Sequence, residues 1–89
     1  MSTLHIINRS PWSSDSWRRC LATLTPGDAI LLIEDAVYAV TRDDLPANCF
    51  VLEPDLSARG LTTTSRTSCV NYAGFVDLVC QYARSISWT

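Results

Sequence analysis

The segment Gly27-Asp28-Ala29-Ile30-Leu31-Leu32-Ile33-Glu34-Asp35 decides the fold. Its centre, residues 29–33, is an unbroken apolar run with turn-forming or acidic residues on both sides. Successive side chains of a strand point to opposite faces, so a strand that is apolar at every position is buried on both faces. This pattern is typical of a parallel sheet covered by helices, and it predicts a central strand of an α/β domain.

Shorter elements surround this strand. Apolar runs predict further strands near residues 4–7, 49–52 and 69–70, and alternation over 86–88 predicts a fifth. Apolar residues at a 3.6-residue period predict helices over 17–24 and 72–83. Together they predict a single small three-layer α/β domain over residues 1–89, with a mostly parallel, four- to five-stranded sheet flanked by helices.

The connection between the second and third predicted strands is short. Within residues 34–48 the segment Ala36–Val40 fits either a helical turn or a strand edge. A parallel crossover needs about a dozen residues or more, usually with a helix, so this connection is near the lower limit. We therefore expect one face of the sheet to be thinly covered and to need an adjacent subunit, and we expect the isolated chain to self-associate.

Composition excludes several classes of protein. Of the 89 residues, 47% are hydrophobic and 18% are charged, unlike a disordered chain. The net charge of -2 argues against direct binding of nucleic acid. No apolar run exceeds five residues, whereas a membrane-spanning helix needs about 20, so no membrane contact is expected. The sequence around Met1 lacks the pattern of a signal peptide, and we expect a cytoplasmic location.

The cysteines give the principal candidate site. They show no CxxC pair, and His5 is the single histidine, so we expect neither a metal site nor a cofactor. Cys20 belongs to the apolar stripe of the first helix, which predicts a buried thiol. However, Arg18 and Arg19 precede it, and their charge would lower its pKa and favour the reactive thiolate. The other three are expected to be core thiols: Cys49, Cys69 and Cys80.

Other polar and aromatic residues have simpler interpretations. His5 lies in a predicted buried strand, which favours a core or capping histidine over a catalytic one. Glu34 and Asp35 follow the central strand, where α/β proteins place ligand groups, but a turn or a helix cap is favoured. We expect Trp12 and Trp88 to be anchors of subunit interfaces, because tryptophan is enriched at interface hot spots.

Four blocks of the sequence, in order, resemble the TusB/DsrH family of sulfur-relay proteins. The similarity covers nearly the whole chain, although the segment between Ala39 and Val51 is shorter than is usual in the family. The blocks are Leu4–Trp12, Gly27–Ala39, Val51–Leu61 and Asn71–Val79, followed by Ser87-Trp88.

This resemblance implies a DsrE/DsrF-like fold and a place in a heterohexamer with TusC/DsrF-like and TusD/DsrE-like subunits. Such a complex passes persulfide sulfur to a TusE/DsrC-like acceptor, toward 2-thiolation of the tRNA wobble uridine or toward sulfur oxidation. Cys20, in the context Arg19-Cys20-Leu21, resembles the cysteine of DsrH-type members, which implies a catalytic, sulfur-carrying role. The alternative is a non-catalytic structural subunit of the same complex. A third, weaker hypothesis is a small-ligand binder that uses Glu34 and Asp35.

Overall fold

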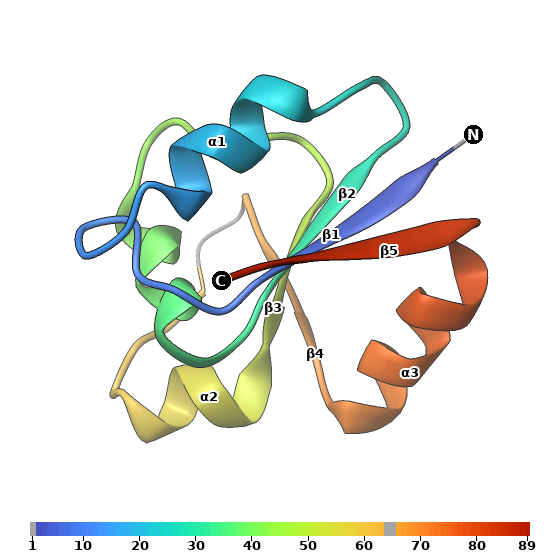
Figure 1. The fold of residues 1–89 in the computed structure, drawn as a ribbon. Helices are drawn as coiled ribbons and strands as arrows, with labels where there is room; N and C mark the ends of the chain where they lie inside the picture. The colour runs from blue at the N-terminus through green and yellow to red at the C-terminus, as the bar shows by residue number, and fades with distance from the viewer. Residues whose placement is uncertain (1, 64–65) are drawn as a thin grey trace.

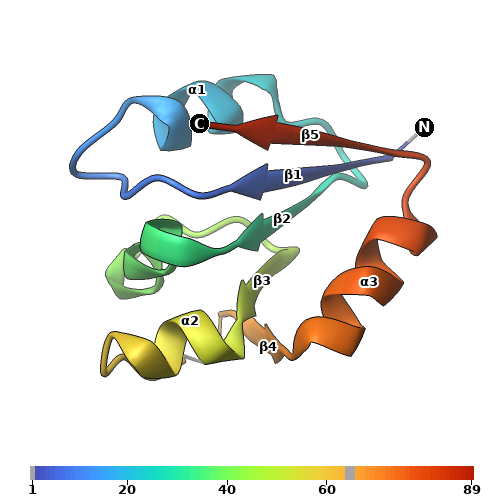
Figure 2. The ribbon, with the colours of Figure 1, turned by 60° about the horizontal axis from the view of Figure 1, so that its bottom comes forward.

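Five strands form one parallel sheet in the computed structural model, which describes residues 2–63 and 66–89. The strands lie side by side in the order β4-β3-β2-β1-β5 (Figure 2), and each neighbouring pair is parallel. The predicted fold class is confirmed, with a sheet that is parallel throughout. The strands are β1 (Thr3–Ile7), β2 (Ala29–Leu32), β3 (Cys49–Leu52), β4 (Ser68–Val70) and β5 (Arg84–Trp88).

The connections cover the two faces of the sheet unequally. Helix α1 (Ser16–Thr23), the 3-10 helix η1 (Glu34–Thr41) and α2 (Glu53–Ala58) lie on one face, and α3 (Tyr72–Gln81) lies on the other (Figure 1). The first three connections step along the sheet in one direction, whereas the last returns from β4 to the far side of β1. Crossovers between parallel strands keep one hand, so a connection in the reverse direction must use the opposite face.

Strand β2 is buried on both faces, as its sequence predicts. Ile30 and Leu32 belong to the larger core under α1, η1 and α2, and Ala29 and Leu31 belong to the smaller core with Leu78 of α3. None of the four strand residues is more than 1% exposed.

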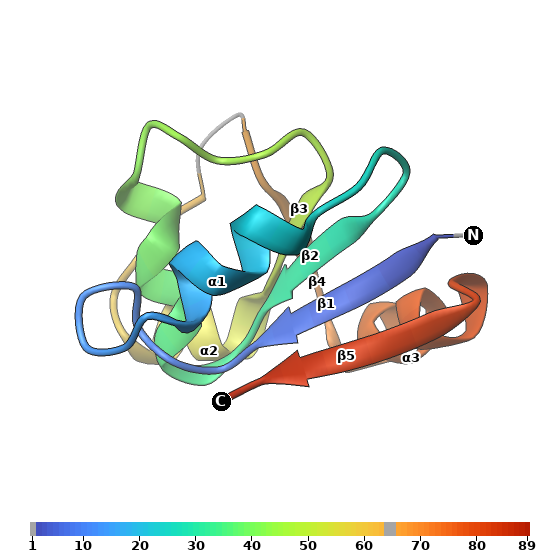
Figure 3. The ribbon, with the colours of Figure 1, turned by 45° about the horizontal axis from the view of Figure 1, so that its top comes forward.

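The short connection after β2 is well packed, contrary to the sequence-based expectation. Residues 36–40 form part of η1, and the side chains of Ala36, Val37, Ala39 and Val40 are buried in the larger core. The thinly covered face is the opposite one, which carries α3 alone (Figure 3). This face is thinly covered because of the strand order: of the four connections between strands, the last one alone runs on it.

A buried hydrogen-bond network joins β5 to β1 and β2. The indole Nε1 of Trp88 donates to Nδ1 of His5 at 3.1 Å, and His5 Nε2 lies 3.0 Å from Oδ2 of Asp28. An indole nitrogen is only a donor, so Nδ1 accepts and the imidazole proton is on Nε2, which donates to Asp28. The Asp28 carboxylate also accepts the backbone N–H groups of Thr3 and Thr25. His5 is therefore confirmed as a core histidine.

The hydrogen bond from His5, with those from Thr3 and Thr25, holds the pKa of Asp28 well below its usual range despite burial. Ionised Asp28 thus stabilises the fold above the unfolded-state pKa of about 4, and this contribution is lost as the pH falls further. We predict that Asp28→Asn lowers the free energy of unfolding at pH 7 by about 1–3 kcal/mol. Its stability should also fall less steeply than that of the wild type between about pH 5 and 2.

Urea unfolding across this pH range measures both effects. Asp43→Asn is the matched control, because it makes the same change at an exposed position and should keep the steep acid dependence. If the stability of the wild type and that of Asp28→Asn fell equally steeply with falling pH, ionised Asp28 would not be the group that stabilises the fold.

Candidate functional site

Cys20 lies in the core of the molecule. It faces inward from α1 and is fully buried in the larger core, together with Trp17 of the same helix and Cys49 of β3. Its thiol therefore has no direct contact with solvent in this conformation. The apolar stripe predicted from the spacing of Trp17 and Cys20 is confirmed.

The pKa of the Cys20 thiol is raised, so the expected lowering by Arg18 and Arg19 is wrong. Burial, with a smaller contribution from the charge of Asp28, raises the pKa of Cys20 to about 12. The side chains of Arg18 and Arg19 are 82% and 61% exposed and lie 4.0 and 3.7 Å from the Asp15 carboxylate. Neighbours in sequence on a helix point in different directions, so these guanidinium groups do not face the buried thiol.

The remaining cysteines divide into two kinds. Cys49 is buried, and burial followed by the proximity of Cys20 raises the pKa of its thiol to about 12. Cys69 and Cys80 are exposed, which corrects the expectation that they are core thiols. Cys69 lies on the edge strand β4, and Cys80 lies on α3.

The outer surface of α3 is apolar although it faces solvent. Only Leu78 of this helix is buried, whereas Tyr72 and Val76 are about 60% exposed and Val79 is 38% exposed. A helix that is apolar around its whole circumference is normally buried within a protein. The helix therefore presents an exposed surface suited to another subunit, which we call the α3 surface: Tyr72, Val76 and Val79.

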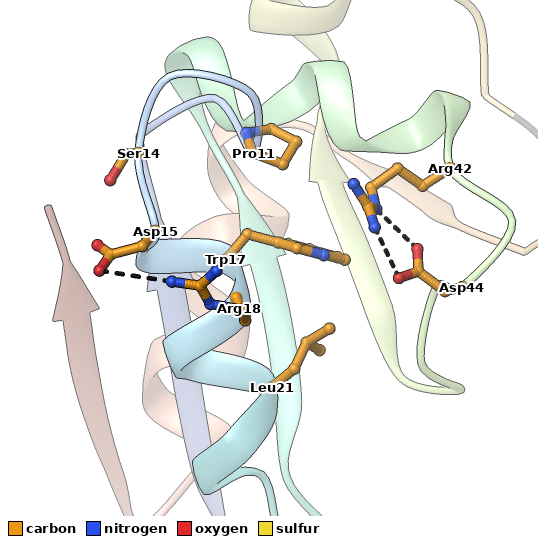
Figure 4. A pocket seen from close by; sticks show the side chains of 8 residues that line it. All are labelled: Pro11, Ser14, Asp15, Trp17, Arg18, Leu21, Arg42 and Asp44. Atoms are coloured by element: carbon orange, nitrogen blue, oxygen red, sulfur yellow. Dashed lines mark hydrogen bonds and ion pairs between the residues drawn. The ribbon is translucent and has the colours of Figure 1, made fainter.

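A polar pocket of about 260 Å³ lies on the other side of the sheet, between α1, the loop before it and the end of η1 (Figure 4). Arg42 makes two hydrogen bonds with Asp44 there, Nε to Oδ1 at 2.7 Å and Nη2 to Oδ2 at 2.9 Å. These bonds raise the pKa of Arg42 and lower that of Asp44. The pocket is lined by Pro11, Ser14, Asp15, Trp17, Arg18, Leu21, Arg42 and Asp44.

The two tryptophans expected to be interface anchors have different surroundings. Trp12 is 64% exposed, with the Arg42 guanidinium carbon 5.8 Å from its ring centroid. Trp88 is half-buried against the larger core and bonded to His5. An anchoring role stays a prediction for both tryptophans. Their contacts with Arg42 and His5 could not be predicted from the sequence, because these residues lie far from them along the chain.

Glu34 and Asp35 are the first two residues of η1 and Ile33 is its N-cap, so neither residue is the helix cap that was one of the two favoured interpretations. The Glu34 backbone N–H donates to Asp55, and Asp35 forms an ion pair with Arg59 at 2.9 Å.

Across residues 2–63 and 66–89, no three His, Cys, Asp or Glu side chains gather in a way that could hold a metal ion. No helix in the described part of the chain is long and apolar enough to span a membrane.

The fold is similar to that of a solved structure. The solution NMR structure of protein Tm0979 from Thermotoga maritima superimposes with a TM-score of 0.63 at 22% sequence identity, covering 91% of this chain and 93% of that one. This likeness concerns the fold: a small α/β domain with a parallel sheet flanked by helices.

Sequence comparisons identify the family. Residues 9–85 match the family model described as DsrH like protein. Protein TusB of Escherichia coli O81 (strain ED1a) and that of Shigella boydii serotype 18 are each 32% identical to this chain over 95 residues, covering 96% of this chain and 99% of the relative. The chain belongs to the DsrH-like family.

The burial of the cysteines predicts two classes of reactivity. We expect iodoacetamide at pH 8 to alkylate Cys69 and Cys80 rapidly, and Cys20 and Cys49 only after unfolding in urea. The thiolate is the reactive form, and a pKa of about 12 leaves few thiolates at that pH. Tandem mass spectrometry of tryptic peptides over a time course measures the four rates, and its fragment ions distinguish Cys69 from Cys80, which lie on the same peptide. Alkylation of Cys20 as fast as that of Cys80 in the folded protein would contradict the structure.

Proposed function

We propose that this chain is a subunit of a cytoplasmic sulfur-relay complex of the Tus/Dsr type, and that it acts there as a structural subunit. The observation that carries the proposal is the apolar α3 surface of a small DsrH-like chain. Exposed apolar surfaces of this kind mark sites of protein–protein interaction. By family resemblance, the partners are TusC/DsrF-like and TusD/DsrE-like subunits, with a TusE/DsrC-like protein as sulfur acceptor.

The relatives named TusB favour the branch of this relay that leads to 2-thiolation of the tRNA wobble uridine. In each transfer, an acceptor thiolate attacks the outer sulfur of a donor persulfide. A new S–S bond forms on the acceptor, the old S–S bond breaks, and the donor leaves as a thiolate. The complex therefore needs accessible, ionised cysteines, which we assign to the partner subunits.

The surroundings of Cys20 favour the structural role over the sulfur-carrying one. A fully buried thiol cannot approach a donor persulfide without opening of α1, and a pKa of about 12 leaves roughly one thiolate in a hundred thousand at neutral pH. The sulfur-carrying role is the alternative, and it requires that complex formation both expose Cys20 and lower its pKa.

Substitution of Cys20 distinguishes the two roles. We expect Cys20→Ala and Cys20→Ser complexes to transfer sulfur at the wild-type rate per assembled complex. Cys20→Ser should lower the free energy of unfolding by about 1–3 kcal/mol, because it buries a hydroxyl in an apolar site. Transfer from a labelled persulfide donor and urea unfolding measure the two quantities. A Cys20→Ala complex that assembles normally but no longer transfers sulfur would refute the structural role.

The α3 surface gives a second test, aimed at assembly. The isolated chain should self-associate at micromolar concentration, and Val76→Glu should both suppress this and prevent assembly with the partner subunits, because it places a charge in the contact. Residue 76 is 60% exposed, so folding should be unaffected. Sedimentation velocity and co-purification with co-expressed partners provide the measurements.

Gln81→Glu is the matched control for Val76→Glu. It introduces the same charge at an exposed position of the same helix but outside the α3 surface, and it should leave assembly intact. Normal assembly of Val76→Glu would exclude the α3 surface as the subunit contact.

A further inference from the structure

Arg42 is held close to two indole rings. Its guanidinium carbon lies 5.8 Å from the ring centroid of Trp12 and 6.0 Å from that of Trp17. Cations within about 6 Å of an aromatic centroid are attracted to the ring. Trp17 is buried and fixed on α1, whereas Trp12 is largely exposed. The planar guanidinium group of Arg42 is thus already held in place at the surface. Binding of a ligand would therefore cost little of its side-chain conformational entropy.

A carboxylate of the chain itself binds this guanidinium group. Asp44, two residues along, accepts from Nε and Nη2 of Arg42 in the two-point geometry that guanidinium groups make with carboxylates. The Arg42 and Asp44 side chains are 32% and 51% exposed. Ion pairs in contact with solvent contribute little to stability, so a second carboxylate can replace that of Asp44 at small cost.

The adjacent pocket contains a buried donor without an acceptor. Among the residues that the structure describes, the indole Nε1 of Trp17 is buried and has no hydrogen-bond partner. Figure 4 shows the Trp17 ring extending from α1 toward the Arg42–Asp44 pair, with Arg18 lining the same pocket. A buried N–H group without an acceptor is unfavourable, because it has lost its hydrogen bonds to water without replacing them. An oxygen ligand placed beside Arg42 would relieve this cost.

We propose that this pocket binds a carboxylate group of a partner polypeptide, which replaces Asp44 on Arg42 and accepts a hydrogen bond from Trp17 Nε1. A volume of about 260 Å³ is small for a cofactor but sufficient for a single acidic residue. The exposed Trp12 beside it is the residue type most enriched at protein interface hot spots, as is arginine. In the free chain, Asp44 takes the place of the partner's carboxylate.

This site is separate from the proposed subunit contact. It uses no cysteine and no residue of α3, and it lies on the face of the sheet that carries α1 and η1 (Figures 1 and 4). A partner at the pocket and a subunit on the α3 surface can therefore bind at the same time. The two proposals can fail independently.

The indole N–H signals of the full-length chain provide the test, in a Val76→Glu background that suppresses self-association and lies outside the pocket. Three tryptophans give three such signals in a ¹H–¹⁵N NMR spectrum, and Trp12→Phe and Trp88→Phe identify that of Trp17 by elimination. The probes are N-acetylglycine, which presents a C-terminal carboxylate, and N-acetylglutamate α-amide, which presents a side-chain carboxylate. N-acetylglycinamide is the uncharged control, at constant ionic strength. Comparison of the two probes also shows whether the pocket prefers a C-terminal or a side-chain carboxylate.

We expect at least one carboxylate probe to shift the Trp17 signal saturably, with a dissociation constant on the order of millimolar. The uncharged control should leave the signal in place. Failure of both carboxylate probes, or an equal shift with N-acetylglycinamide, would overturn the proposal.

Three variants test the roles of Arg42 and Asp44 in carboxylate binding. Asp44→Asn should tighten carboxylate binding about two- to fivefold, because it removes the internal competitor. Asp43→Asn changes the net charge equally but does not free Arg42, and it should leave the affinity unchanged. Arg42→Lys keeps the charge but loses the planar guanidinium group, and it should weaken binding about tenfold or more. The same spectra verify that each variant is folded. Equal effects of Asp44→Asn and Asp43→Asn, or unchanged binding by Arg42→Lys, would contradict the proposal.

Discussion

The burial of β2 on both faces is the constraint on which the rest of the structure depends. Its four side chains are excluded from solvent by two different cores, so helices are required on both sides of the sheet. In a chain of 89 residues, three connections cover one face, and only the last crosses to the other. A single helix, α3, therefore covers the smaller core, and its outer surface with Tyr72, Val76 and Val79 is exposed.

Much of the fold could be predicted from local patterns, because burial on both faces and helical periodicity leave clear signals in the sequence. The apolar run at 29–33 predicted β2, and the spacing of Trp17 and Cys20 predicted the buried face of α1. The strand order could not be predicted, since nothing local shows that β5 returns to lie beside β1. The conformation of Ala36–Val40 could not be predicted either, because its burial depends on how β2, β3 and α2 pack around it in three dimensions.

The candidate site was harder to predict than the fold, because it depends on which way side chains point. Two arginines before Cys20 suggested a lowered pKa, yet the helix directs them to solvent and the thiol to the core. Likewise, Arg42 and Trp12 are far apart in the sequence and meet only through the packing of η1 beside the loop before α1. The two surfaces that we propose to be functional lie on opposite faces of the sheet, and Cys20 is buried in the larger core.

The location of sulfur in the working complex tests this account most directly. The complex, reconstituted with TusC- and TusD-like partners, is loaded from a persulfide donor, quenched by alkylation under denaturing conditions and mapped by peptide mass spectrometry. The account predicts that the added sulfur is found on a partner cysteine and that Cys20 is recovered as an unmodified thiol. A stoichiometric gain of one sulfur atom at Cys20 would contradict it and make this chain a sulfur carrier.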